Sequence, residues 1–79
     1  MGNTGITKQQ FLDWALRRGW TKDKWGHLHK RIGDTDYRFK VSSIAVRHEM
    51  KGRSGWIRMR SGYFKDLSFS NDDKLRGLR

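Results

Sequence analysis

The chain contains no cysteine and no proline. Without cysteine it forms neither a disulfide nor a cysteine-ligated zinc site, the usual supports of very small domains. Proline-rich linkers are likewise excluded. Apolar residues occur only in short runs such as Ile44–Val46, far below the length of a membrane-spanning helix. From these absences we expect a cytoplasmic protein with no membrane partner, no metal and no cofactor.

Acidic residues are scarce. Eight Asp and Glu stand against eighteen Lys and Arg, so the net charge is +10. Residues 1–40 and 41–79 each carry nine basic and four acidic side chains. The positive charge therefore belongs to the whole chain and not to a basic tail. It predicts a polyanionic partner, with RNA or DNA first and an acidic protein surface as the alternative.

The length of 79 residues predicts one small domain over residues 1–79, of which residues 1–6 are expected to be flexible. Thr7 and Gln10 have the spacing of a capping box, which predicts a helix that begins at Lys8 and ends near Arg18, before Gly19. Beyond Trp20 the apolar residues recur at every second position, which is typical of strands. We predict an α+β fold with this N-terminal helix packed on a curved antiparallel sheet of roughly 3–4 strands.

The expected strands cover residues 26–32, 37–50, 56–63 and 65–70, and residues 74–78 are left as a short helix or a further strand. Within 37–50 the apolar residues change from odd to even positions at Ser42 and Ser43. A bulge inside a single strand explains this change and predicts the curvature. An exposed edge strand of such a sheet can pair two copies, so a homodimer is an open possibility.

A basic surface is expected around the third strand. Trp56, Arg58 and Arg60 alternate with Ile57 and Met59, so we expect the first set on an exposed face and the second in the core. The preceding strand and loop add further cations to this nucleic-acid-binding surface, namely Arg38, Lys40, Lys51 and Arg53. Arginine pairs with phosphate and an aromatic ring stacks on bases, so the combination suits nucleic acid.

Two histidines offer a catalytic alternative. His27 and His29 alternate along the first strand, with Lys30 beside them. A histidine can act as general base or acid on a ribose hydroxyl, with Lys30 and Tyr63 in support. A metal site would need a third ligand from His48, Asp34 or Asp36, and the spacing is not diagnostic of one.

The order of helix, Gly19-Trp20 and a strand opening at Gly26-His27 resembles the N-terminal part of HicA-type toxins. These are small RNA-cleaving proteins with a fold like that of double-stranded-RNA-binding domains. The resemblance implies a catalytic role for His27.

We therefore interpret the chain as a non-enzymatic protein that binds RNA or DNA mainly through the backbone. The first alternative is a small metal-independent endoribonuclease that uses His27. The second is a phage or mobile-element protein that inhibits a nucleic-acid-handling protein.

Overall fold

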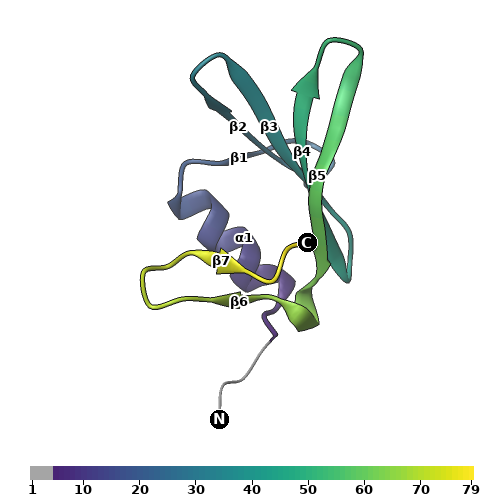
Figure 1. Cartoon of the computed structure of the whole chain (residues 1–79). Helices are drawn as coiled ribbons and strands as arrows, with labels where there is room; N and C mark the ends of the chain where they lie inside the picture. Colours follow the sequence, from purple (N-terminus) through teal and green to yellow (C-terminus); the bar gives the residue numbers. More distant parts are fainter. Residues whose placement is uncertain (1–4) are drawn as a thin grey trace.

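The computed structural model describes residues 5–79. Helix α1 (Lys8–Arg17) is followed by five strands: β1 (Thr21–Lys22), β2 (Leu28–Ile32), β3 (Thr35–Val41), β4 (Ala45–Gly52) and β5 (Gly55–Tyr63). A short 3-10 helix, η1 (Phe64–Asp66), leads to β6 (Ser68–Phe69) and β7 (Leu75–Arg76). Figure 1 shows the hairpins β2–β3 and β4–β5 extending away from the end of the molecule that holds α1, β6 and β7.

The strands form a five-stranded antiparallel sheet in the order β1-β2-β3-β4-β5, and β6 and β7 form a separate two-stranded sheet. The predicted fold, with a helix packed on a sheet of three to four strands, is therefore wrong. The molecule is mostly an antiparallel sheet in which each strand pairs with the next along the chain, together with one short helix.

The predicted number of strands was too low because of residues 42–44. Val41 pairs with Val46, and the backbone N–H of Ser42 donates to the carbonyl oxygen of Ala45 at 2.9 Å. The parity change there is a hairpin turn between β3 and β4, and not a bulge within one long strand. Residues 65–70 differ as well, because η1 occupies the start of that segment and only Ser68–Phe69 is extended.

Helix α1 begins as expected. The Thr7 hydroxyl accepts from the Gln10 backbone N–H at 3.0 Å, and the Gln10 side chain accepts from the Thr7 N–H at 2.8 Å, which confirms the capping box. Its buried side chains are Phe11, Trp14 and Ala15. Leu16, near the end of the helix, is about half exposed at 48%.

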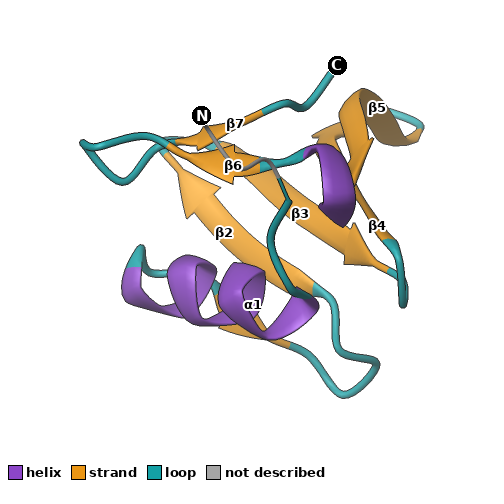
Figure 2. Cartoon of the chain, turned by 90° about the horizontal axis from the view of Figure 1, so that it is seen from below, coloured by secondary structure: helices purple, strands orange, loops and turns teal. Residues whose placement is uncertain are grey.

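The core is rich in aromatic side chains and is centred on Phe39 of β3. Its ring lies 5.1 Å from Phe11, edge to face, and 4.4 Å from Trp20. Trp14 is fixed from the other side, since its indole N–H donates to the carbonyl oxygen of Asp73 at 2.6 Å. The remaining buried apolar residues are Ala15, Leu28, Val46, Phe64 and Leu67. The β6–β7 hairpin packs on α1, since the Phe69 ring stacks on Trp14 at 5.8 Å and Asp73 pairs with Arg17 at 3.3 Å. Figure 2 shows strands β2 and β3 of the large sheet beside α1.

The core does not reach the far ends of the long hairpins. Ile57 of β5 is 52% exposed and Met59 is 44% exposed, so the prediction that both pack in the core is wrong. The molecule measures 43 × 24 × 22 Å, and these residues lie on the extended part of the sheet. These two apolar side chains are therefore open to solvent.

Both ends of the described chain are hydrogen-bonded to β5 or to the segment that follows it. Gly5 and Ile6 donate backbone hydrogen bonds to Leu67 and Phe64, at 2.7 and 2.9 Å. Of the residues predicted to be flexible, 1–4 lie outside the described part of the chain. At the C-terminus, Arg79 and Ser61 exchange two backbone hydrogen bonds, which extends the sheet at the edge of β5.

Candidate functional site

The register of the sheet divides its side chains into two faces. Residues paired in an antiparallel sheet point to the same side, so His48, which pairs with Phe39, lies on the core side. Arg38 pairs with His29 on one side and Glu49 on the other, and these alternate residues point away from the core. We call this second side the open face. It carries the cations Arg31, Arg38, Lys40, Arg47, Lys51 and Arg58, the acids Asp36 and Glu49, and His29, Trp56, Ser61 and Tyr63.

A register shift changes the composition of this face. Between His48 and Glu49 the pairing with β5 moves by one residue, so Glu49 is opposite Arg58 while His48 is opposite Arg60. A bulge of this kind turns the following side chains to the other side. Arg60 therefore lies on the core side, and the prediction that it shares a face with Trp56 and Arg58 is wrong.

The other predicted cations fall in two places. Lys40, on β3, and Lys51, on β4, belong to the open face together with Arg38. Arg53 lies in the turn between β4 and β5, at the tip of the hairpin. Within residues 5–79, Lys40, Lys51 and Arg58 form no ion pair, so their charges are available to a partner.

The centre of the open face is held by a buried carboxylate. Glu49 is only 5% exposed, and it accepts a hydrogen bond from Arg38 Nε at 2.5 Å. Arg47 Nη1 lies 3.7 Å from the other carboxylate oxygen. Glu49 thus fixes Arg38 by a strong charge-assisted hydrogen bond. Its contact with the half-exposed Arg47 is a weaker ion pair.

Trp56 lies under two cations. The Arg38 guanidinium carbon is 4.3 Å from the centre of the indole ring, and Lys51 Nζ is 5.3 Å from it. The His29 ring approaches edge-on at 6.2 Å. The indole is half-buried by these neighbours, and its cation–π contacts further restrict Arg38.

The histidines are engaged with the backbone and with Asp23. His27 Nδ1 accepts the backbone N–H of Val41 at 3.0 Å, which leaves the ring proton on Nε2. His29 Nε2 lies 2.6 Å from Asp23 Oδ2. Burial alone would raise the pKa of Asp23, but hydrogen bonds from His29 and from the backbone of His27 and Trp25 lower it below 3.8.

Lys30 does not lie on the same face as His27, as the catalytic alternative requires. Lys30 pairs with Tyr37 on the core side, and its ammonium donates to the carbonyl oxygen of Arg18 at 2.6 Å, at the C-terminal end of α1. His27 has its lone-pair nitrogen in the Val41 hydrogen bond, so this geometry does not suit a general base. In the described part of the chain, no group of three His, Asp or Glu side chains is placed to hold a metal ion.

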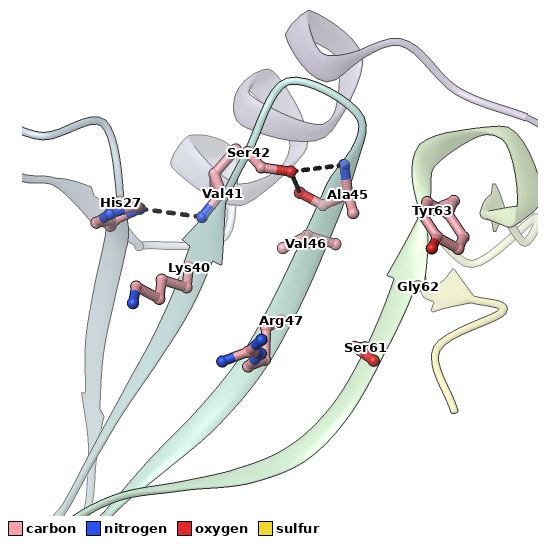
Figure 3. Close-up of a pocket in the computed structure, with 10 residues that line it drawn as sticks. All are labelled: His27, Lys40, Val41, Ser42, Ala45, Val46, Arg47, Ser61, Gly62 and Tyr63. Atoms are coloured by element: carbon pink, nitrogen blue, oxygen red, sulfur yellow. Dashed lines mark hydrogen bonds between the residues drawn. The ribbon is translucent and has the colours of Figure 1, made fainter.

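A pocket of about 480 Å³ opens beside the turn between β3 and β4. Its walls include His27, just before β2, and Lys40, Arg47, Ser61 and Tyr63 on β3, β4 and β5. Figure 3 shows Lys40, Arg47 and Ser61 between His27 and Tyr63. The sequence-based interpretation missed Arg47 and Ser61, and it gave Tyr63 only a supporting role in the catalytic alternative. The sequence did carry a signal for Arg47. The apolar residues change from odd to even positions at Ser42 and Ser43, and a hairpin turn at that point places Arg47 opposite Lys40.

No known protein family, curated protein or solved structure matches the chain. The HicA resemblance accordingly gains no support from these comparisons. No helix within residues 5–79 is long and apolar enough to cross a membrane. The open face and its pocket are the features from which a function can be inferred.

His48 makes the stability of the fold depend on pH. Its ring stacks on Phe39 at 4.8 Å, and its Nδ1 is buried without a hydrogen-bond partner among the described residues. Burial lowers the pKa of His48 below 6.5, and the nearby Arg60 lowers it further. The unfolded chain therefore binds a proton more readily than the folded protein.

We expect the folded protein to lose stability as the pH falls from about 7 through the ordinary histidine range. The His48→Phe variant keeps the aromatic stacking and removes the titrating group, so its thermal midpoint should fall less over this range. Because His48 is only half-buried, the difference should be a few degrees. Parallel curves for the two proteins between pH 7.5 and 5.5 would rule out this role for His48.

Proposed function

We propose that the protein binds nucleic acid through the open face, mainly by contacts to phosphates. One observation carries the proposal: the open face gathers six Lys and Arg against two acids, Asp36 and Glu49. Both acids are already ion-paired with arginines of the same face. The remaining positive field favours a polyanion, because phosphate contacts release counterions and supply most of the affinity.

The geometry of a sheet supports a backbone-directed mode of binding. Neighbouring strands lie about 4.8 Å apart, and same-face residues along a strand are about 6.7 Å apart. Lys40 on β3, Arg47 on β4 and Arg58 on β5 thus form a two-dimensional array of donors with flexible stems. Such an array can follow a phosphate backbone without reading the bases. A cytoplasmic site of action is part of the proposal.

Two variants of equal charge test whether the open face is the binding surface. Lys40→Ala/Arg58→Ala removes from it two cations that form no ion pair in the described part of the chain. Lys8→Ala/Lys74→Ala removes two exposed cations from α1 and from the β6–β7 turn. We expect the first variant to bind RNA and DNA about tenfold or more weakly than wild type, and the second to change affinity by less than about threefold.

The assay is a fluorescence anisotropy titration with labelled single- and double-stranded RNA and DNA at one salt concentration. Equal losses in the two variants would mean that net charge alone attracts the ligand and would contradict an interface on the open face. If wild type binds none of the four nucleic acids, the proposal fails and a protein partner with an acidic surface becomes the leading hypothesis.

A further inference from the structure

In the pocket beside the β3–β4 turn, two positively charged side chains lie opposite each other. Lys40 and Arg47 are directly paired across β3 and β4. Like charges in this position destabilise a sheet. Glu49 offsets Arg47 at 3.7 Å, but Lys40 has no acidic partner within residues 5–79. An anion seated between the two side chains would remove the repulsion.

His27 supplies a third donor to the same place. Its Nδ1 is occupied by the N–H of Val41, as the dashed line in Figure 3 marks, so the N–H group at Nε2 is left for another partner. His27 precedes Leu28, which pairs with Phe39, so it lies in the same cross-strand row as Lys40. Ser61, which pairs with Arg47, continues the row on β5 and adds a hydroxyl. This set of donors suits a phosphate group.

Tyr63 provides the aromatic part of the pocket. It is 52% exposed, and its partner across the sheet is Ala45, whose small side chain leaves the ring uncovered. Lys65 Nζ lies 5.8 Å from the centre of the ring. An uncovered aromatic ring beside a group of phosphate donors matches the two halves of a nucleotide, because bases stack on aromatic side chains.

We propose that this pocket binds one unpaired nucleotide, with its phosphate held by Lys40, Arg47 and His27 and its base stacked on Tyr63. The inference rests on the proposed nucleic-acid function and deepens it, since it makes single strands or unpaired ends the preferred ligand. A base within a duplex is already stacked on its neighbours and does not reach the ring without being displaced.

The Tyr63→Leu variant tests the stacking, and Trp25→Leu is the control, because Trp25 is an aromatic residue that is 71% exposed and lies outside the pocket. We expect Tyr63→Leu to weaken binding of a short single strand by about tenfold, to leave duplex binding unchanged, and to keep the thermal midpoint of wild type. Trp25→Leu should leave both affinities unchanged. Equal effects of the two variants, or an equal loss on single strand and duplex, would overturn the proposal.

Small probes then distinguish a nucleotide site from a simple anion site. In NMR titrations of the wild-type protein, uridine 5′-monophosphate should shift the amides of Lys40 and Arg47 and the ring signals of Tyr63. Inorganic phosphate should shift the two amides without the ring, and uridine should shift neither. If the nucleotide perturbs other parts of the protein and spares these signals, the pocket is not its site, even where longer strands still bind the open face.

Discussion

Raising the salt concentration from about 50 to 200 mM should weaken the complex with duplex DNA by a factor between roughly one hundred and two thousand. The range follows from the charges of the open face. If all six cations contact phosphates, the slope of log affinity against log salt is about −5.4, and if two are neutralised by Asp36 and Glu49 it is about −3.6. The positions of these two acids make the shallower value the better expectation for wild type.

The measurement is a series of anisotropy titrations at five or more salt concentrations, with the slope taken from the linear region. The Lys40→Ala/Arg58→Ala variant should lower the magnitude of the slope by about two, because each lost phosphate contact removes about one unit. A slope near zero for wild type would exclude binding through phosphates. An unchanged slope in the variant would place the contacts elsewhere on the molecule.

The Glu49→Gln variant should move stability and affinity in opposite directions. Glu49 is buried, and its carboxylate holds Arg38 at 2.5 Å and Arg47 at 3.7 Å. Glutamine keeps the shape and one hydrogen-bond acceptor but leaves the half-buried Arg38 without a compensating charge. Loss of a charge-assisted hydrogen bond costs about 2–3 kcal/mol, which corresponds to roughly 10 °C or more in the thermal midpoint of a domain of this size.

The same substitution adds one unit of positive charge at the centre of the open face and releases two guanidinium groups. Affinity for nucleic acid should therefore rise, by about tenfold at low salt. Asp36→Asn is the matched control, since Asp36 is half exposed and pairs with Arg31 at 3.5 Å. The Asp36→Asn substitution also removes one negative charge, but it should lower the free energy of unfolding by less than about 1 kcal/mol. A Glu49→Gln variant as stable as Asp36→Asn would contradict the positioning role of the buried carboxylate.

The helix was predictable because its signals are local. The capping box of Thr7 and Gln10 and the Gly19 position, with φ of 92°, depend on a few neighbouring residues. The strand count was not predictable in the same way. An apolar pattern that changes parity at Ser42 and Ser43 is produced equally by a bulge and by a hairpin turn, and only the pairing of Val41 with Val46 decides between them.

The candidate site depended on the same non-local information. Arg38, Lys40 and Trp56 could be placed on one face from alternation alone. Arg60 could not, because the apolar residue Met59 gives no sign of the register shift that moves Arg60 to the side of His48. Arg47 could be placed opposite Lys40 only from the pairing of β3 with β4. Lys30 does not support His27 because its side chain lies on the core side and donates to the carbonyl oxygen of Arg18.

The indole signals of the protein give the most direct test of the open face. Trp56 lies on that face, whereas Trp14 and Trp20 are buried in the core. In a titration of labelled protein with a short single-stranded oligonucleotide, we predict that the indole N–H of Trp56 and the amides of Lys40 and Arg58 shift, while the indoles of Trp14 and Trp20 stay in place. Shifts confined to α1 and the β6–β7 hairpin, with Trp56 unmoved, would contradict the account.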